Sequence, residues 1–425
     1  MAMKRMTVVL GAALAGALMS ASAQVSFTHF KSVDLSSYFP TNGPQGDLAS
    51  DVAFDGANLY IAGMSNSTGS QPVGVLKISN VLSLDAGAWG YSPLISLSQA
   101  GQRSTYVVYR DGFLYLGTGL GDGSNQAANT GIRKYDAQTG TQVSDWNGTG
   151  VVLPTNLDGS GRAECIEIDP GYQGSGQSSL AVLARGRGYI FLRDFATGGV
   201  LANILSLPSR DCQGQQTTRG MRDITFSPEG DAYLRVDNSI FYAQRTGPNS
   251  VAGGLACQIF DFSSDNPFQV LINIHYLRTP TGSNFLIYNR RGTSPPLNKV
   301  FIATGSGAAW TPYTELTGDE PLPNGSTPNP FGGNIFNFTS GFGPDPSKGD
   351  VNLDGIVDDA DLLAILFAFG SSDAAVDVNS DGIVDDADLL TVLFNFGSSP
   401  QAQYLFVVHS TISTDRLDIY RVDVN

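Results

Sequence analysis

One unit of the chain is written twice, and this duplication constrains the fold of the C-terminal part more than any other feature. DVNLDGIVDDADLLAILFAFG begins at Asp350, and DVNSDGIVDDADLLTVLFNFG begins 27 residues later at Asp377. Both copies place acidic or amide side chains at positions 1, 3, 5, 9 and 12 and a glycine at position 6. Self-similarity at a fixed interval indicates a repeated structural unit, here an oxygen-rich loop followed by an apolar segment.

The oxygen-bearing positions match the needs of a calcium loop. Calcium takes six to eight hard oxygen ligands, and a short loop has to turn sharply to place them, which the glycine at position 6 permits. Position 7 contributes its main-chain carbonyl, and position 12 is aspartate where glutamate is usual. The predicted ligands of two calcium ions are Asp350, Asn352, Asp354, Ile356, Asp358 and Asp361 in the first loop and Asp377, Asn379, Asp381, Ile383, Asp385 and Asp388 in the second.

A helix is expected after each loop. Leucine, isoleucine and phenylalanine recur at helical spacing after Asp361 and again after Asp388. Gly370 and Gly397 stand where a C-terminal cap belongs. The repeat therefore predicts a small helical calcium domain.

This duplicated loop and helix resembles the type I dockerin module, over about 50 of the 425 residues. The resemblance implies that both loops bind calcium, that the helices pack antiparallel, and that one face docks a cohesin-like protein. It also implies that loop positions 10 and 11 choose the partner; these are Asp359 and Ala360 in the first copy, and Asp386 and Ala387 in the second. Aromatic residues stand where the family usually has basic ones, so a structural insert without a partner is the alternative.

The N-terminal residues have the pattern of a secretory signal peptide. A basic start is followed by an apolar run over residues 7–19 and by small residues before Gln24. The run is shorter than the roughly 18 apolar residues of a membrane helix. We expect removal of residues 1–23 and a secreted or cell-surface protein without a membrane span.

The acidity of the chain is local. The net charge is -15, and eleven aspartates between Asp350 and Asp388, with no Lys or Arg among them, account for all but four of these charges. No cluster of Lys or Arg stands beside an aromatic stripe, so the sequence does not predict nucleic-acid binding.

Three cysteines leave the disulfide pairing open. Export permits one disulfide. Cys212 and Cys257 lie in loop-like sequence and are the predicted pair, with Cys165 left in a strand, although every pairing among the three is compatible with the sequence.

The rest of the chain consists of short apolar strands separated by turns. The turn glycines Gly56, Gly112, Gly171 and Gly230 recur at intervals of 56, 59 and 59 residues. Sheet units at such a period predict a mainly β fold, a β-propeller of about six blades. A pair of β-sandwiches is the alternative fold.

The strand that opens each unit is expected to line the central channel. The first five openings are predicted at 51–54, 106–109, 164–168, 223–226 and 284–288. Carboxylates on them could carry out glycoside chemistry, and the candidates are Glu164, Glu167, Asp169 and Asp223. The alternative is that these acids bond turns or pair with arginine.

The last unit explains the position of the calcium module. Residues 334–338, 404–408 and 417–422 are predicted strands of one blade, and the module is inserted between the first two of them. The predicted domains are propeller at 24–340, dockerin-like insert with semi-flexible linkers at 341–403, and last blade strands at 404–425. Residues 25–35 are expected to supply an outer strand that closes the ring.

No catalytic motif identifies an activity. The sequence contains no G-x-S-x-G elbow, H-E-x-x-H helix or Walker loop, and catalytic residues stay unknown. The main hypothesis is a secreted calcium-binding protein whose propeller binds a glycan or protein ligand while the dockerin-like module attaches it elsewhere. The alternatives are a secreted glycoside hydrolase or lyase in polysaccharide breakdown, and a structural surface or matrix protein.

Overall fold

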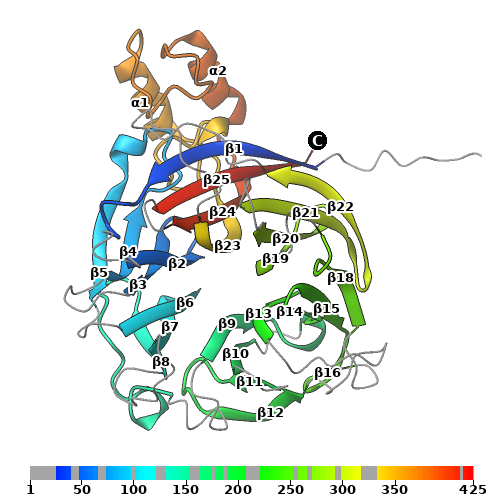
Figure 1. The fold of residues 1–425 in the computed structure, drawn as a ribbon. Helices are drawn as coiled ribbons and strands as arrows, with labels where there is room; N and C mark the ends of the chain where they lie inside the picture. Colours follow the sequence, from blue (N-terminus) through cyan, green and yellow to red (C-terminus); the bar gives the residue numbers. More distant parts are fainter. Residues whose placement is uncertain are drawn as a thin grey trace, which may run out of the picture.

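Six antiparallel blades stand in a ring around a central channel, which confirms the predicted β-propeller of about six blades (Figure 1). The inner strand of each blade contacts the inner strands of both neighbouring blades, so the ring is closed. The computed structural model describes residues 25–39, 47–65, 73–96, 102–120, 131–152, 163–174, 178–184, 189–206, 221–251, 257–265, 270–291, 298–316, 333–411 and 415–424.

The first three blades follow the chain from the inside of the ring to the outside. The first contains β2 (Asp47–Phe54), β3 (Leu59–Ser65), β4 (Val73–Ser79) and β5 (Gly90–Ser96). The second contains β6 (Gln102–Arg110), β7 (Phe113–Leu120) and β8 (Gly131–Asp136), and the third contains β9 (Ala163–Asp169), β10 (Ser179–Ala184), β11 (Tyr189–Arg193) and β12 (Val200–Ser206).

The next two blades have the same order. The fourth contains β13 (Met221–Phe226), β14 (Ala232–Val236), β15 (Ser239–Ala243) and β18 (Cys257–Asp261), with a small hairpin of β16 (Arg245–Gly247) and β17 (Ser250–Val251). The fifth contains β19 (Val270–Arg278), β20 (Asn284–Arg291), β21 (Asn298–Ser306) and β22 (Ala309–Leu316).

The fifth blade corrects one prediction. The stretch 284–288 was expected to open this blade, but it belongs to β20, the second strand. The opening strand is β19, which pairs with β20 and contacts the inner strands on both sides. Its turn to β20 contains Pro280 and Gly282 and lacks the acidic-glycine pair seen in other blades, so the expected signal was absent.

The sixth blade combines the two ends of the described chain. It contains β23 (Gly333–Pro344), β24 (Gln401–Thr411), β25 (Asp415–Val424) and, outermost, β1 (Val25–Asp34). Val25 pairs with Val424 and Asp34 with Arg416, which confirms the predicted closing strand. Closure by an N-terminal strand joins the last blade to the first part of the chain.

Apolar residues fill the space between blades. Among the described residues of the propeller, six clusters of buried side chains each contain residues of two neighbouring blades. The cluster between the sixth and first blades includes Leu35, Leu82, Trp89 and Phe406. Burial of this kind is the main stabilising term of a β fold, and here it holds the blades to one another.

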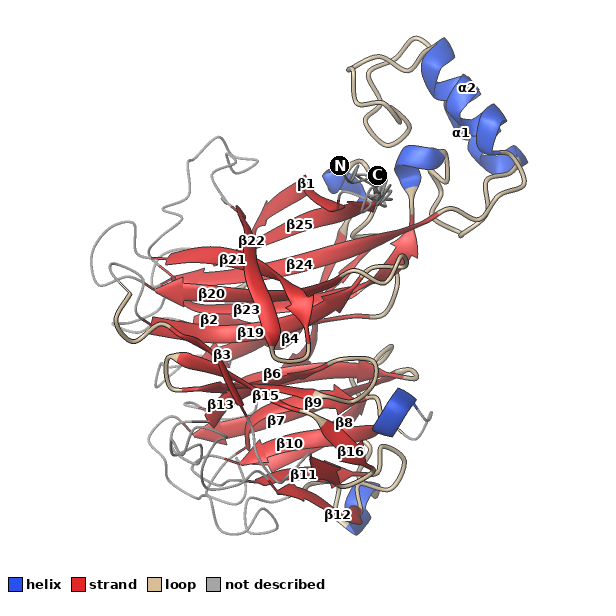
Figure 2. Cartoon of the chain, turned by 90° about the vertical axis from the view of Figure 1, so that its right-hand side faces the viewer, coloured by secondary structure: helices blue, strands red, loops and turns tan. Residues whose placement is uncertain are grey.

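The helical lobe lies between β23 and β24 and stands outside the ring, beyond the ends of β24 and β25 (Figure 2). It contains the short 3₁₀ helix η6 (Pro346–Lys348), α1 (Asp359–Ala368) and α2 (Asp386–Asn395). Its own buried cluster contains Val357, Ile365, Val376, Val378, Val384 and Val392. The lobe thus has a core separate from the propeller.

The lobe is joined to the propeller by paired strands where semi-flexible linkers were expected. Pro344 pairs with Gln401, and Tyr404 donates a hydrogen bond to the carbonyl of Pro344 at 2.9 Å. The main-chain N–H of Asp345 donates to the carbonyl of Pro400 at 3.1 Å. We call these paired residues, 344–345 and 400–401, the neck. Their hydrogen bonds restrict the orientation of the lobe relative to the propeller.

Two further expectations concern cysteines and membranes. Cys257 is disulfide-bonded and Cys165 is a free, buried thiol, while Cys212 lies outside the described residues. Residues 1–23, the predicted signal peptide, also lie outside them. In the part of the chain that is described, no helix has the length and apolarity to cross a membrane.

Candidate functional site

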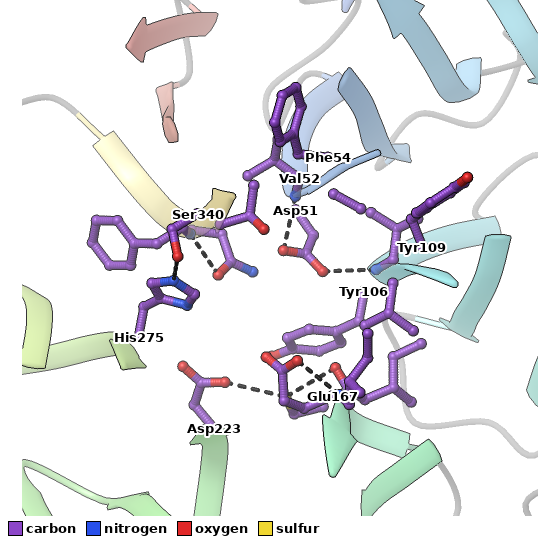
Figure 3. A pocket seen from close by; sticks show the side chains of 18 of the residues that line it. Asp51, Val52, Phe54, Tyr106, Tyr109, Glu167, Asp223, His275 and Ser340 are labelled. Carbon is purple, nitrogen blue, oxygen red and sulfur yellow. Dashed lines mark hydrogen bonds between the residues drawn. The ribbon is translucent and has the colours of Figure 1, made fainter. Parts of the chain in front are cut away.

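A cavity of about 190 Å³ lies in the central channel and is lined by residues from all six inner strands (Figure 3). Three carboxylates from three different blades face it: Asp51 on β2, Glu167 on β9 and Asp223 on β13. His275 on β19 and Ser340 on β23 form the part of the wall between Asp223 and Asp51. The ring therefore brings together acids that lie more than 50 residues apart in the sequence.

Two of the three carboxylates tie neighbouring blades together. Asp51 accepts the N–H of Val52 at 2.8 Å and that of Val107, on the next blade, at 2.7 Å. The pairing of β2 with β3 shifts by one residue just before Asp51, and a bulge of this kind re-aims the side chain that follows it.

Asp223 has the same arrangement on the fourth blade. It follows a register shift in β13 and accepts the N–H of Ile224 at 3.0 Å and that of Ile274, on the next blade, at 2.7 Å. The thiol of Cys165 adds a third hydrogen bond at 3.1 Å. Both Asp51 and Asp223 thus hold fixed positions in the channel wall.

Glu167 is less constrained than the two aspartates. Its Oε1 accepts the N–H of Ile168 at 2.7 Å, and the side chain keeps part of its surface open to the cavity. Burial raises the pKa of Glu167 to about 7, with a further contribution from the charge of Asp223. Near neutral pH this carboxyl group exists both with and without its proton.

The other two carboxylates differ from Glu167 in how they titrate. Burial raises the pKa of Asp223 to about 6, although its backbone hydrogen bonds and the Cys165 thiol oppose the shift. Burial also raises the pKa of Asp51 well above its usual value, and the charges of Glu167 and Asp223 add to that effect. The channel thus contains acids of unequal strength, which is what acid–base catalysis uses.

His275 and Ser340 form a neutral polar pair. The Nε2 atom of His275 lies 2.8 Å from the hydroxyl of Ser340. Burial lowers the pKa of His275 to about 4, so the ring is uncharged at neutral pH. An uncharged imidazole and a hydroxyl can donate to and accept from the hydroxyl groups of a ligand.

Of the four acids that were predicted to line the channel, the structure places two in the cavity wall and one elsewhere. Glu167 and Asp223 line the cavity, as expected. Asp169 does not, because it is buried at the C-terminal end of β9, where both oxygens contact the Arg245 guanidinium at 3.0 and 3.1 Å. The side chain of Glu164 lies outside the described residues.

Sequence reasoning missed Asp51, His275 and Ser340. Asp51 opens the first predicted strand and could have been found by treating every unit alike. His275 was missed because β19 was not identified. Ser340 lies near the end of a strand whose sequence carries no signal for a polar role.

The two loops of the helical lobe have nearly identical hydrogen bonds. Asp350 Oδ2 accepts the N–H of Gly355 at 3.0 Å, and Asp377 Oδ2 accepts that of Gly382 at 2.8 Å. Both glycines have positive φ, 93° and 94°, as the sharp turn requires. The first aspartate of each loop is thereby held across the turn.

Positions 9 and 12 of each loop start the following helix. Asp358 accepts the N–H of Ala360 at 2.8 Å, while Asp361 Oδ2 accepts the N–H of Asp358 at 2.9 Å, which forms a capping box. Asp361 Oδ1 also accepts two N–H groups from the start of the loop. Asp385 and Asp388 repeat this arrangement before α2.

The first loop has an unexplained buried oxygen. Asp350 is fully buried, and its Oδ1 has no hydrogen-bond partner. Burial and the neighbouring carboxylates of Asp361 and Asp354 raise its pKa to about 6. A buried carboxylate oxygen without a donor fits a cation ligand, because a cation removes both the desolvation cost and the repulsion.

Within the described residues, no three His, Cys, Asp or Glu side chains lie together closely enough to form a metal site by themselves. An ion in these loops would therefore also need the amide oxygens of Asn352 and Asn379 and main-chain carbonyls, such as those of Ile356 and Ile383. Oxygen donors of all these types suit calcium, so the residues present fit the predicted ion.

The predicted partner-binding residues are accessible. Asp359, Ala360, Asp386 and Ala387 are exposed at the first turns of the two helices. Apolar side chains are exposed on the helices as well, including Phe367 at 87% and Phe394 at 82%.

No model of a known protein family matches the chain, and no curated protein matches it. Solved structures of similar fold include a protein from Lactobacillus plantarum, with 13% identity over 70% of this chain and 83% of that chain and a TM-score of 0.38. A GH43 protein from Bacillus licheniformis has 12% identity over 66% and 56%, and an arabinanase from Bacillus subtilis has 15% over 66% and 97%, both with a TM-score of 0.37. Likenesses of this size carry no information on activity.

Proposed function

We propose that the central channel is the active site of a glycoside hydrolase that acts on an uncharged sugar at the end of a chain. The observation that carries the proposal is the convergence of Asp51, Glu167 and Asp223 on one cavity. Glycoside hydrolysis needs two carboxyl groups, one that donates a proton and one that is ionised. A cavity with acids of unequal strength meets this requirement.

Glu167 is the proposed general acid. Its pKa of about 7 keeps a proton available at neutral pH, and its exposed surface faces the cavity. Protonation of the glycosidic oxygen makes the departing sugar a neutral alcohol, which lowers the barrier to bond cleavage.

Asp223 is the proposed ionised partner. With a pKa of about 6 it is mainly a carboxylate at pH 7, and its backbone hydrogen bonds fix its position. It would activate water or stabilise the positive charge that develops on the sugar ring. Burial raises the pKa of Asp51 well above its usual value, and its hydrogen bonds to the backbone of β2 and β6 keep the two blades in register.

The cavity's size and charge define the substrate class. Its volume of about 190 Å³ is small beside the roughly 300–1,000 Å³ of most ligand pockets, which favours one terminal sugar over a threaded polymer. The described lining residues include three carboxylates and no Lys or Arg. Uronic acids and sulfated sugars would be repelled, so the substrate sugar is uncharged.

Hydrolysis of a panel of neutral aryl glycosides and oligosaccharides tests the proposal. Glu167→Gln should reduce the rate by about 10²–10⁴, since one general acid contributes that much. Glu315→Gln is the matched control, because Glu315 lies exposed on the outer strand β22 and pairs with Lys299. Turnover that Glu167→Gln leaves unchanged would contradict the assignment.

Ligand binding without turnover is the second candidate. The observation that favours it is that Asp51 and Asp223 each use both oxygens on backbone N–H groups of two blades, which is a structural role. A glycan that binds in the channel, with no hydrolysis by the wild-type protein, would support this reading.

The proposal assigns calcium binding and attachment to the helical lobe. Each loop would hold one Ca²⁺ through the predicted oxygen ligands, and the ion would neutralise carboxylates in a span, from Asp350 to Asp388, that contains no Lys or Arg. The exposed turns at Asp359 and Asp386 would bind a cohesin-like protein. With the predicted signal peptide, this describes an exported enzyme attached to a scaffold.

Calorimetry tests the calcium assignment. Two ions should bind per chain, and none should bind when both Asp350 and Asp377 are replaced by alanine. A flat titration of the wild-type protein would contradict it.

A further inference from the structure

The two calcium loops differ at the residue in position 4. Leu353 occupies this position in the first loop and Ser380 in the second, and both have left-handed backbone, with φ of 63° and 59°. Both copies therefore share this conformation, whichever residue stands at position 4. Serine tolerates it better than leucine, for which a left-handed backbone is a rare and strained state.

The leucine has a packing partner that the serine lacks. Leu353 is half-buried and packs against the hydrophobic cluster between the sixth and first blades, which includes Leu82 and Trp89. Ser380 is exposed. The first loop thus touches the core of the propeller at the very position where the repeat has diverged.

The neck beside Leu353 is closely packed. A Cβ at Gly343 would lie 2.4 Å from a methyl group of Leu82, so no larger residue fits there without movement. Arg421 of β25 donates a hydrogen bond to Ser347, and its Nη1 lies 3.7 Å from Asp345. These contacts hold the segment that leads into the first loop against the propeller.

We propose that Leu353 is a calcium-dependent latch between the lobe and the propeller, an inference that rests on the proposed calcium binding. Calcium in the first loop fixes the left-handed turn and thereby keeps Leu353 packed against the propeller core. The two ions are then inequivalent. The first stabilises the propeller and orients the lobe, while the second stabilises the lobe alone.

The dependence on calcium follows from two opposing effects. Packing a half-buried leucine against a core is favourable, but a left-handed backbone costs a comparable amount for an L-residue. Without an ion, the loop can relax away from the left-handed backbone at Leu353. This removes the backbone strain but loses the packing of Leu353 against the propeller core. With the ion the turn is imposed by the ligands, so the packing becomes a net gain, and a ligand that binds the folded state raises its stability.

Tryptophan fluorescence can follow the propeller separately from the lobe. All three tryptophans, Trp89, Trp146 and Trp310, lie in the propeller, and residues 345–400 contain no Trp or Tyr. Thermal unfolding of the full chain would be followed by this signal in excess Ca²⁺ and in chelator. We expect calcium to raise the melting temperature of the wild-type protein by about 2 °C or more.

Leu353→Ser, which copies the second loop, should remove this shift while calorimetry still detects two ions. Ser380→Leu is the matched control and should keep the shift, because Ser380 is exposed. Asparagine tolerates a left-handed backbone, so Leu353→Asn should also lose the calcium-dependent shift in melting temperature. This second variant keeps the test decisive if Leu353→Ser fails to fold.

The possible results separate a failure of the Leu353 latch from a failure of the proposed calcium binding. If wild-type protein binds two ions but Leu353→Ser and Leu353→Asn retain the full calcium shift, the latch is refuted and calcium binding stands. A wild-type protein that binds calcium without any shift refutes it equally. If calorimetry detects no calcium at all, the calcium proposal fails and the latch fails with it.

Discussion

At the scale of the residue, the channel is defined by carboxyl groups that the fold buries without a basic partner in the cavity lining. Burial raises the pKa values of Asp51, Glu167 and Asp223, and the charge of Asp223 makes ionisation of Asp51 and Glu167 harder still. Such groups are costly to keep, because a buried ionised acid destabilises the folded state. Retaining three of them around one cavity is therefore most simply explained by function.

Glu167→Gln should make the protein more stable in alkaline solution. The folded-state pKa of Glu167, about 7, lies above its ordinary value of 4.5, so the folded state holds the proton more tightly and stability falls as pH rises through this interval. Removing the charge should raise the free energy of unfolding by up to about 3 kcal/mol at pH 8, at about 1.36 kcal/mol per pKa unit, and by little at pH 4. Denaturant unfolding at several pH values measures the difference; equal pH slopes for both proteins would contradict it.

Only part of this site could be read from the sequence. Glu167 and Asp223 were found because they lie on strands next to recognisable turns. Asp169 was wrongly predicted to line the channel because its partner, Arg245, is 76 residues away in the sequence. No local sequence pattern predicts a buried ion pair between such distant residues. Asp51 and His275 line the same cavity only when the ring closes. The sequence pattern of a single strand does not show which residues of different blades will meet.

At the scale of the element, the closing blade depends on one buried carboxylate that joins three strands. Asp418 on β25 accepts from Ser32 of β1 and from Arg416 at 2.5 Å each, and Nε2 of His409 on β24 lies 2.9 Å from it. Burial alone would raise the pKa of Asp418, but His409, Arg416 and Ser32 together hold it below its usual value. Its stabilising effect is therefore present at neutral pH and lost as the solution becomes strongly acidic.

Asp418→Asn should strongly destabilise the propeller. The change leaves Arg416 buried without its carboxylate, a situation that typically costs about 3–5 kcal/mol. Asp423→Asn, on the same strand, is the control, because its ion pair with Arg421 is partly exposed and should be worth below about 1 kcal/mol. Denaturant midpoints at pH 7 compare them, and similar losses for both variants would argue against a special role for Asp418.

Strands were easier to predict than their roles. Apolar runs bounded by an acidic-glycine turn marked the first two strands of the first, second and fourth blades. The fifth blade was shifted by one strand because β19 ends in a turn without that signature. Sequence patterns therefore gave the spacing of the blades, whereas the identity of the inner strand needed the three-dimensional ring.

At the scale of the whole molecule, the chain is a propeller with a helical lobe inserted into one hairpin. The lobe has a core of its own, and Pro344 and Gln401 are directly paired at its base. The duplicated loops made this insertion visible in the sequence. The neck and the contact of Leu353 with the propeller were not visible, because the linker-like composition of residues 341–348 hid a paired strand.

Removing the lobe should leave a folded propeller. Residues 345–400 can be replaced by Asn-Gly, since Pro344 and Gln401 stand opposite each other and this dipeptide closes two-residue hairpins. Circular dichroism and thermal unfolding should show a cooperative β protein that binds no calcium. A truncated protein that fails to fold would show that the lobe is needed to build the sixth blade.

The dependence of kcat/KM on pH tests the central claim, acid–base chemistry in the channel, most directly. A general acid with a pKa of about 7 must be protonated and a partner with a pKa of about 6 must be ionised. Hydrolysis of a neutral glycoside should therefore follow a bell-shaped curve with its maximum between about pH 6 and 7, and Glu167→Gln should remove the alkaline limb along with most of the rate. A rate that keeps rising beyond pH 8, or no hydrolysis of any glycoside at any pH, would contradict the account.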